Sequence, residues 1–476
     1  MAAAATIARR PPASSRSVLS WWLAAAGCLL FAALSLLIAR QPTYDPTAWL
    51  IWGREVVHGD LSTTAGPSWK PLPIVITAPT ALLGDTAQAQ VWLVVARTGT
   101  LAAVGLAYRL AWRLEGAAAG VVAAAALLCS TGFTARTFRG NSEGLLVAVA
   151  FGAIEAHLSG RRRLAFALLV AATLLRPELF LFAAGYGLWL VWTAPDAVRR
   201  GRTLAVAASA GVLVVAAWLI PEQVGSGQLF RAASRALEPV AGSPATAAFP
   251  FLATFTNAAP ALPWPLYAAG VAYVALAVRD VRRGGEGPGA RRALTTLALA
   301  AIATAVMVLI ALMAQAGFTG NIRYLTIPIA LTGVVGAAGL VRVARLARAR
   351  LSPRAATVAI ALGAVVAAPF AVAVLLRTID QFRGGLHESR LYAALPAALA
   401  RAGGPAAVLR CGTPAAAPFD VQTLARALHV HQAQVGFRPV LPGTLVLRRE
   451  DAAPLDRRFP NRTVTPSWVI ASSCPR

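Results

Sequence analysis

The sequence predicts an all-α polytopic membrane protein with about eleven transmembrane helices, interfacial helices in its first outward loop and a small C-terminal α+β domain. Two observations support this fold class. Hydrophobic residues make up 57% of the chain and charged residues only 13%, whereas about a quarter of a soluble domain is charged. In addition, apolar runs of membrane-spanning length alternate with short Arg clusters. Because the net charge of +25 is divided among these clusters, it indicates membrane topology, and no nucleic-acid partner is expected.

The apolar runs and the basic clusters agree on one orientation. Cytoplasmic loops collect Arg and Lys, and every dense Arg cluster between the runs falls on one side when the N-terminus is cytoplasmic. The first run is too long for the apolar region of a signal peptide, so we expect it to remain as the first helix. The expected spans are 19–39, 88–112, 116–133, 143–158, 164–176, 178–193, 203–220, 263–279, 293–314, 324–341 and 355–376.

This orientation divides a multi-pass cell-membrane protein into three parts. Residues 1–18 form a cytoplasmic N-terminal tail, residues 19–376 a transmembrane domain, and residues 377–476 an extracytoplasmic C-terminal domain. The first extracytoplasmic loop, residues 40–87, lies on the same side as the C-terminal domain. Only this side has loops long enough for a reaction site.

The four cysteines separate into two pairs. Cys28 and Cys129 lie inside apolar runs and are expected to be small core residues. Cys411 and Cys474 lie in the polar C-terminal domain, where they can form a disulfide if the compartment is oxidising.

The stretch TYDPTAWLIWGRE, residues 43–55, gathers charged and aromatic residues between two apolar runs. Asp45 followed by Pro46 is a helix-start pattern, because Asp caps free amides and Pro needs no donor. We expect a helix over about 46–58, with Trp49 and its apolar neighbours at the membrane surface. A cap, worth about 1 kcal/mol, is one interpretation of Asp45, and a reaction site is the other. The loop also contains Tyr44, Arg54, Glu55, His58, Asp60 and Lys70.

A second helix is expected over residues 68–85. Its apolar sequence is interrupted by Pro71, Pro73 and Pro79, so we expect it to skim or dip into the bilayer and not to span it. The first loop is therefore predicted to consist of two interfacial helices beside a polar crevice.

Four motifs, in this order and spacing, resemble one family. They are the acid of YDPTAW after the first span, the segment KPLP leading to LLGD, LLRPELFL at 174–181 and IRYLTIP at 322–328. Together they resemble the GT-C glycosyltransferases over roughly residues 19–341, and within them the protein O-mannosyltransferases and lipid A aminoarabinose transferases. Many of those proteins have two adjacent acids in the first loop, or Lys-Pro-Pro-Leu. This chain has one acid, Asp45, and Lys70-Pro71-Leu72-Pro73, which leaves open whether a metal is used and which residue is the second acid.

The resemblance implies a membrane enzyme that transfers a hexose or pentose from a polyprenyl-phosphate-linked donor. The acceptor would be an extracytoplasmic envelope glycan, lipid or protein, and membrane lipids would surround the enzyme. Asp45 matches the catalytic acid of the family and would act as general base in an inverting transfer. Glu143 is the second catalytic candidate, and Tyr44, Trp49 and Glu55 are candidates for sugar or acceptor binding. No cofactor is certain, although a divalent cation such as Mg or Mn is a candidate.

A departing phosphate requires Arg or Lys donors. Three of the candidates also have a structural interpretation: Arg176 can pair with Glu178, Arg323 can be an interfacial anchor, and Lys70 can extend its amine from the bilayer to water. The candidates on the outward side are Lys70, Arg139, Arg176 and Arg323.

The segment RTFRGNSEGLL, residues 136–146, is the second segment on the outward side that is rich in polar residues. Glu143 is placed to favour the start of a helix, because an acid there interacts well with the helix dipole. Alternatively, Glu143 binds sugar hydroxyls or a cation with Asp45, and Arg139 meets the phosphate.

A transporter or lipid flippase is the main alternative function. An enzyme of this kind should bring Asp45, Glu143 and at least one of the basic candidates into one outward cavity that opens to lipid. The histidines show no metal-ligand spacing with nearby Cys or acids, so no zinc site is expected.

Overall fold

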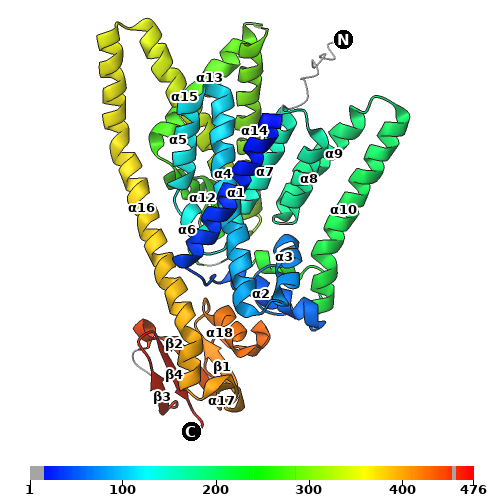
Figure 1. The fold of residues 1–476 in the computed structure, drawn as a ribbon, viewed down its shortest axis with the longest axis vertical. Coiled ribbons are helices and arrows are strands. Elements are labelled where there is room, and N and C mark those ends of the chain that lie inside the picture. Colours follow the sequence, from blue (N-terminus) through cyan, green and yellow to red (C-terminus); the bar gives the residue numbers. More distant parts are fainter. Residues whose placement is uncertain (1–14, 240, 285, 453–456, 476) are drawn as a thin grey trace.

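The computed structural model describes residues 15–239, 241–284, 286–452 and 457–475, so most of the expected tail 1–18 lies outside the described residues. The fold is mainly helical (Figure 1). The α-helices are α1 (Ser15–Leu34), α2 (Asp45–His58), α3 (Pro71–Ala81), α4 (Asp85–Glu115), α5 (Ala117–Leu128), α6 (Phe133–Phe138), α7 (Glu143–Leu158), α8 (Arg162–Thr173), α9 (Phe180–Trp192), α10 (Ala197–Ser226), α11 (Arg231–Ala236), α12 (Pro250–Ala258), α13 (Trp264–Arg282), α14 (Pro288–Gln315), α15 (Thr326–Arg350), α16 (Pro353–Arg401), α17 (Gly404–Arg410) and α18 (Val421–Leu428). Short 3-10 helices are η1 (Ser35–Leu37), η2 (Pro177–Leu179), η3 (Pro244–Thr246), η4 (Ala259–Ala261), η5 (Ile322–Leu325), η6 (Gln432–Gln434) and η7 (Arg449–Asp451).

Among the described residues, six helices are long and apolar enough to cross a membrane, and the chain is therefore a membrane protein. They are Leu19–Leu37, Asp85–Glu115, Ala197–Ser226, Pro288–Gln315, Ile322–Arg350 and Pro353–Arg401. A seventh span results if α12 with η4 and α13, which are bent by 108°, are counted together. The predicted number of eleven is not confirmed, because α5, α7, α8 and α9 have only 12, 16, 12 and 13 residues.

The centre of the helical bundle is packed through small residues. Helix α15 is largely buried and packs along α13, where Gly339 faces the backbone of its neighbour. A Cβ added at Gly339 would lie 2.1 Å from the carbonyl oxygen of Ala269, a distance that no side chain can occupy. Small residues of this kind let membrane helices approach closely without a strong hydrophobic driving force.

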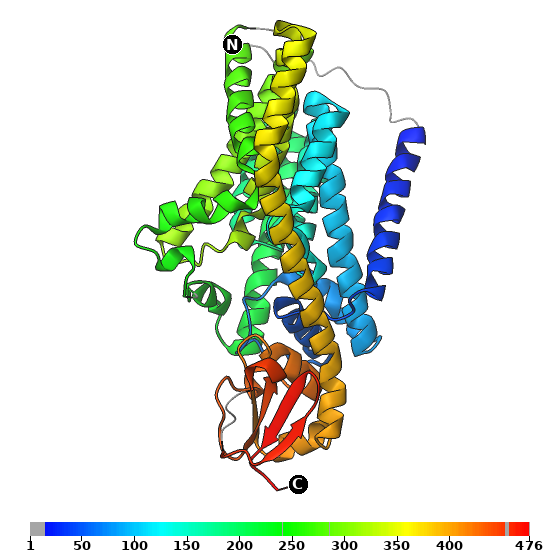
Figure 2. The same ribbon diagram turned by 90° about the vertical axis from the view of Figure 1, so that its left-hand side faces the viewer.

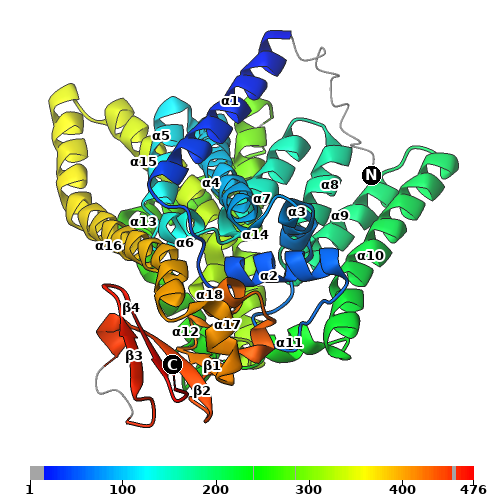
Figure 3. The ribbon, with the colours of Figure 1, turned by 60° about the horizontal axis from the view of Figure 1, so that its bottom comes forward.

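The two ends of the bundle differ. Figure 1 shows the α9–α10 and α15–α16 connections at one end, and α2, α3 and the C-terminal domain at the other. Figure 3 looks at this second end, where α2, α11 and α18 lie near one another. The first of these ends carries the Arg clusters 199–202 and 342–354, which the sequence predicts to share one side.

Helix α2 is a buried helix, which corrects the prediction that its aromatic residues lie at the membrane surface. Trp49 and Trp52 have no exposed surface, and the only exposed apolar residues of α2 are Val56 and Val57. The reason is close packing against α3: a Cβ at Gly53 would lie 2.6 Å from the hydroxyl oxygen of Thr77. A glycine at this position lets α3 cover the face that the sequence suggested would meet lipid.

Helix α16 joins the bundle to the C-terminal domain. It has 49 residues and, at 1.5 Å per residue, is about 74 Å long, more than twice the thickness of a hydrocarbon core. The predicted span 355–376 is its first half only. Figure 2 shows the same helix running on to the sheet of the C-terminal domain.

The C-terminal domain has a four-stranded sheet with helices α17 and α18. The strands are β1 (Thr413–Ala416), β2 (Gly443–Arg448), β3 (Asn461–Val464) and β4 (Trp468–Ser472), in the order β1-β2-β4-β3. Strands β1 and β2 are parallel and the other pairs antiparallel. A disulfide joins Cys411 to Cys474, whose Cα atoms lie 5.6 Å apart. The predicted α+β character of this domain is therefore present.

Candidate active site

Arg323 connects two carboxylates that are far apart in the sequence. Its Nη2 donates to Oδ2 of Asp45 at 2.5 Å, and its Nε donates to Oε1 of Glu143 at 2.9 Å. Asp45 begins α2, Glu143 begins α7 and Arg323 lies in η5, so three helix starts meet at one point. Asp45 is 5% exposed and Glu143 is fully buried. Both carboxylates are thus withdrawn from water and held by one guanidinium.

These contacts decide between the sequence-based interpretations of the acids. The N-cap of α2 is Tyr44, and the cap carries no side-chain hydrogen bond, so Asp45 is the first helical residue and not the cap. Glu143 likewise follows the N-cap Ser142. The helix dipole favours both acids at these positions, but their side chains are directed to Arg323.

Arg176 completes the environment of Glu143. Its Nη2 donates to Oε1 of Glu143 at 3.1 Å and to the carbonyl oxygen of Arg323 at 3.4 Å. Its guanidinium carbon lies 4.1 Å from the ring centroid of Tyr324, a cation–π arrangement. The ion pair with Glu143 replaces the alternative pair with Glu178, because the Pro177 break turns Arg176 toward α7.

Lys70 approaches the same site from the N-cap of α3. It is only 6% exposed; its Nζ lies 3.5 Å from the hydroxyl of Ser142 and 4.9 Å from the ring centroid of Trp49. Burial, with the positive charges of Arg176 and Arg323, lowers the pKa of Lys70 to about 7, against the opposing effect of the two carboxylates. This burial excludes the interpretation of Lys70 as an amine that extends to water.

Arg136 is a basic residue of the site that the sequence did not single out. Its charge interacts with Glu143, Arg323 and Arg176, and burial lowers its pKa to about 10. Its buried Nε has no hydrogen-bond partner among the described residues. The signal was the pair Arg136 and Arg139, one in α6 and the other its C-cap, but only the packing of this segment decides which of them faces inward.

Arg139 is not brought into this cluster. Its Nη1 pairs with Glu388 of α16 at 3.3 Å, and its Nη2 donates to the carbonyl oxygen of Gln381, also at 3.3 Å. The predicted phosphate contact of Arg139 is therefore replaced by a link between α6 and α16. Arg136 is the nearer candidate.

Arg97 holds the two segments that lead to the carboxylates. It is 4% exposed and donates to the hydroxyl of Ser35 at 2.8 Å and to the carbonyls of Ala39 and Phe138, each at 3.0 Å. The first two partners precede the first loop, and the third precedes Glu143. A buried cation is expensive unless its donors are satisfied, so this arrangement stabilises both approaches to the site. Nothing in the sequence distinguished Arg97 from other arginines near apolar runs.

Glu55 lies far from the cluster. It is ten residues beyond Asp45, about 15 Å along α2. Its Oε1 lies 2.7 Å from Nδ1 of His431, and its Oε2 accepts from the amide of Ser62 at 3.0 Å. The structure therefore supports no sugar contact for Glu55 at Asp45. Trp49 does lie at the site, next to Lys70. It is fully buried, however, and therefore has no surface that could bind an acceptor.

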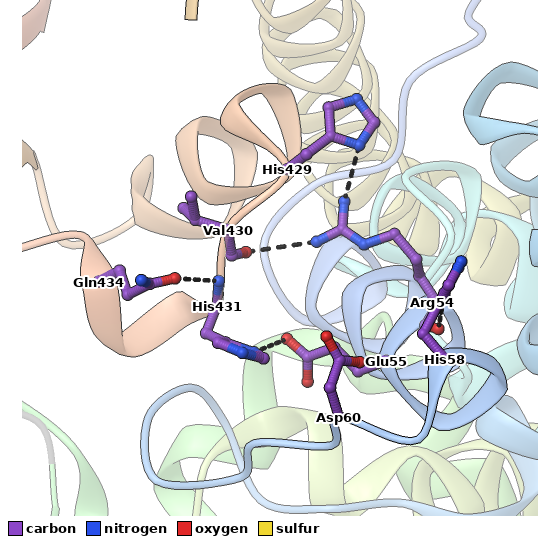
Figure 4. Close-up of a pocket in the computed structure, with 8 residues that line it drawn as sticks. All are labelled: Arg54, Glu55, His58, Asp60, His429, Val430, His431 and Gln434. Atoms are coloured by element: carbon purple, nitrogen blue, oxygen red, sulfur yellow. Dashed lines mark hydrogen bonds and ion pairs between the residues drawn. The ribbon is translucent and has the colours of Figure 1, made fainter. Parts of the chain in front are cut away.

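Figure 4 shows the surroundings of Glu55, a pocket of 240 Å³ between α2 and the C-terminal domain. Glu55 faces His431, while Arg54 faces His429 and the carbonyl oxygen of Val430, at 3.3 Å each. Burial raises the pKa of Glu55, and the hydrogen bonds from Ser62 and His431 act against this rise. The contacts around this pocket attach the C-terminal domain to the first loop.

Replacing Glu55 by Gln is expected to weaken this one contact of the C-terminal domain, while α16 and the hydrogen bonds of Arg54 and Arg426 keep the domain in place. The amide retains hydrogen bonding but loses the charge opposite His431, so limited proteolysis of the C-terminal domain should become faster. We expect any activity at the Asp45 site to stay within about twofold of that of the natural protein, because substitutions at sites this far apart act independently. A loss as large as that of an Asp45 variant would contradict this assignment and return Glu55 to the site.

A divalent cation does not fit between Asp45 and Glu143 as they are arranged. The guanidinium of Arg323 lies between the two carboxylates, and Lys70, Arg136 and Arg176 add positive charge around them. Hard cations prefer several oxygen ligands. Within the described ranges, no three His, Cys, Asp or Glu side chains are grouped as metal ligands.

Comparison with solved structures identifies the fold. No protein-family model and no curated protein sequence matches this chain. The crystal structure of ArnT from Cupriavidus metallidurans in the apo state is similar over 96% of this chain and 98% of its own, with 15% identity and a TM-score of 0.53. ArnT bound to undecaprenyl phosphate has the same coverage and identity and a TM-score of 0.52. This chain has the GT-C fold.

The GT-C fold predicted from four motifs is thereby confirmed. The structural similarity covers more of the chain than the motifs did. The motifs covered roughly residues 19–341, whereas the likeness to ArnT, a lipid A aminoarabinose transferase, also includes most of the C-terminal region. Within this GT-C fold, the motif residues Asp45, Lys70, Arg176 and Arg323 converge at one end of the bundle.

Proposed function

We propose that this chain is a membrane glycosyltransferase that takes a sugar from a polyprenyl-phosphate-linked donor. The observation that carries the proposal is the charge of the buried cluster. Lys70, Arg136, Arg176 and Arg323 face Asp45 and Glu143, an excess of two positive charges while Lys70 is protonated and of one when it is neutral. Buried charge needs compensation, and a phosphate supplies it. The similar ArnT structure bound to undecaprenyl phosphate supports this ligand class.

In this proposal the groups of the site have complementary roles in one displacement step. Asp45 accepts the proton of the acceptor hydroxyl while the hydroxyl oxygen forms a bond to the anomeric carbon, and the bond from that carbon to the phosphate oxygen breaks. Arg323 binds Oδ2 of Asp45, which leaves Oδ1 for the hydroxyl. Because attack is opposite the phosphate, the anomeric configuration inverts. The charge that develops on the departing phosphate is stabilised by the neighbouring basic groups.

Glu143 acts in this proposal mainly by orienting cations. Both Arg176 and Arg323 donate to its Oε1, while its Oε2 is buried without a partner among the described residues. A buried carboxylate oxygen of this kind requires a hydrogen-bond donor, and a hydroxyl of the transferred sugar supplies one. Tyr44, the other sequence candidate for acceptor binding, lies between the ring of Phe419 and the guanidinium of Arg235, and we assign it no contact with the acceptor.

Affinity for the lipid phosphate is expected to fall as the pH rises through 7. Lys70 is cationic below its pKa of about 7 and neutral above it, so the favourable charge is lost in alkaline solution. Between pH 6 and 8 we expect binding of a polyprenyl phosphodiester, whose own charge is constant, to weaken about tenfold. Tryptophan fluorescence in nanodiscs measures this affinity. In Lys70→Met the slope should disappear, and an unchanged slope in that variant would contradict the role of Lys70.

Transfer is expected to be independent of divalent cations, since Arg323 takes the position between the two carboxylates. Dialysis against a chelator should leave the rate unchanged. A loss of activity that Mg²⁺ or Mn²⁺ restores, while other ions do not, would contradict this expectation.

We assign the site and residues 377–476 to the extracytoplasmic side of the cell membrane, residues 1–18 to the cytoplasm, and the eleven expected runs to the region 19–376. The Arg clusters at the opposite end of the bundle support this orientation. The acceptor would be an envelope glycan, lipid or protein.

The transfer reaction itself is tested with purified protein in nanodiscs. Radiolabelled polyprenyl-phosphate mannose and arabinofuranose are supplied with a cell-envelope extract as acceptor. We expect label in one acceptor class, and mass spectrometry of envelope glycans after deletion of the gene should show the same class missing. Movement of the intact lipid across the bilayer without sugar transfer would instead support the flippase alternative.

A further inference from the structure

Tyr44, directly before Asp45, has an unusual backbone conformation. Its φ is 38° and its ψ is −103°, a positive φ that residues with a side chain rarely adopt. Such conformations persist where surrounding contacts enforce them, and they cluster at functional sites. The conformation matters here because the φ and ψ of Tyr44 determine how the chain enters α2, and therefore where the Asp45 carboxylate lies.

Two elements outside the bundle core contact the Tyr44 side chain. Phe419, between β1 and α18 in the C-terminal domain, packs edge-on against its ring with centroids 5.3 Å apart. The guanidinium of Arg235 in α11 lies near the phenol oxygen, and Arg235 in turn pairs with Glu238. Tyr44 is therefore held between the C-terminal domain on one side and α11 on the other.

Phe419 is itself fixed by a buried polar cluster. Its carbonyl accepts from the hydroxyl of Tyr392 in α16 at 3.3 Å. The next residue, Asp420, is 1% exposed, accepts from the same hydroxyl at 2.9 Å and forms a two-point ion pair with Arg448 at 2.6 and 2.8 Å. Paired contacts of this type restrain geometry strongly. The Phe419 ring is thus presented to Tyr44 from a rigid support, although the ring itself remains 59% exposed.

We propose that the C-terminal domain positions the catalytic base: Phe419 holds Tyr44 in its strained conformation, and Tyr44 holds Asp45 beside Arg323. Tyr44 and Phe419 are positioning residues, since they act through Asp45. The proposal rests on the glycosyl transfer proposed above and gives the C-terminal domain a part in it. Its chemical effect is on the alignment of the base with the acceptor hydroxyl, where a displacement of about 1 Å lowers rates by roughly 100-fold.

The first test compares two phenylalanines of the same domain. Phe419→Ala removes the contact with Tyr44, while Phe437→Ala removes an equally exposed ring, 60% against 59%. We expect Phe419→Ala to lower kcat by about 2- to 10-fold, the worth of one aromatic pair, with an unchanged KM for the donor. Phe437→Ala should leave both constants unchanged. Equal effects of the two substitutions, or an effect of Phe419→Ala on KM alone, would overturn the proposal.

The second test uses the backbone of Tyr44. Glycine adopts positive φ without strain, so Tyr44→Gly should fold but leave the start of α2 free to move, with kcat lowered about 100-fold. Tyr44→Phe keeps the ring against Phe419 and loses only the hydroxyl, so its kcat should stay within about threefold of the natural protein. A Tyr44→Phe enzyme as inactive as Tyr44→Gly would show that the hydroxyl acts in the chemistry and that positioning by the ring is not the role.

Hydrogen exchange separates failure of this proposal from failure of the proposed function. Amides of residues 44–48 should exchange faster in Phe419→Ala than in Phe437→Ala, whether or not sugar is transferred. If exchange differs between the two variants but neither they nor the natural protein transfer sugar, the coupling of Phe419 to the start of α2 is correct and the enzymatic function is wrong. If exchange is identical in the two variants, the coupling is wrong whatever the activity.

Discussion

Asp45→Asn is expected to lower sugar transfer by about 10²- to 10⁴-fold, the usual contribution of a general base. The amide has the shape of the carboxylate but cannot take the proton of the acceptor hydroxyl. The variant should still fold, because Arg323 retains its 2.9 Å hydrogen bond to Glu143 and can donate to the amide oxygen. Rates measured with a saturating donor in nanodiscs check this prediction.

Lipid binding provides the control for Asp45. Asp45→Asn removes one negative charge beside the basic residues. The affinity of this variant for the polyprenyl phosphodiester should therefore be equal to or higher than that of the natural protein. Asp60→Asn, in the same loop and beside the pocket of Glu55, is the matched substitution and should keep its activity. A fully active Asp45→Asn enzyme would remove Asp45 as the base.

Arg323→Lys is expected to lower kcat by about 10²- to 10³-fold, although the positive charge is kept. Lysine has one compact ammonium, so it cannot reproduce donation by Nε to Glu143 together with donation by Nη2 to Asp45. The carboxylate of Asp45 would lose its orientation. Rates and donor affinity of the purified variant measure the loss, and most of it should be in kcat.

Arg345→Lys is the control for this substitution. Arg345 also donates to a buried carboxylate, that of Glu115 at 2.6 Å, but it does so at the other end of the bundle. Its replacement should leave transfer unchanged. In addition, the Asp45→Asn and Arg323→Lys effects should combine to much less than their product, because both act on one pair of groups. Independent, multiplicative effects would contradict the pairing.

The sequence was informative where a single property decides the structure. Apolar runs and Arg clusters predicted the helical membrane domain, and the motifs around Asp45, Lys70, Arg176 and Arg323 predicted residues that the fold brings together. Charged residues at apolar helix ends are costly, so their presence there already indicates partners. Hydropathy and the cost of a charge at a helix end are the same whichever helices become neighbours.

The sequence was misleading where the direction of a side chain decides. Arg136 and Arg139 are equivalent by composition, yet α6 turns one toward Glu143 and the other toward Glu388. Glu55 shares a helix with Asp45 but faces His431. The aromatic residues of α2, expected at lipid, are buried against Trp69 and against Trp92 of α4. Each outcome depends on packing between elements that are distant in the chain.

The amino-acid sequence by itself determined that this chain enters a membrane, which end of its helices carries the basic loops, and that an acid and several cations follow the apolar runs, because hydropathy and charge act locally. Only the tertiary structure decided that Arg323 joins Asp45 to Glu143, that the cluster has more cations than acids, and that Phe419 contacts Tyr44. The reason is geometric: ion pairs and ring contacts form over a few ångströms, whereas these residues are 98 to 375 positions apart in the chain and are brought together only by the packing of their helices.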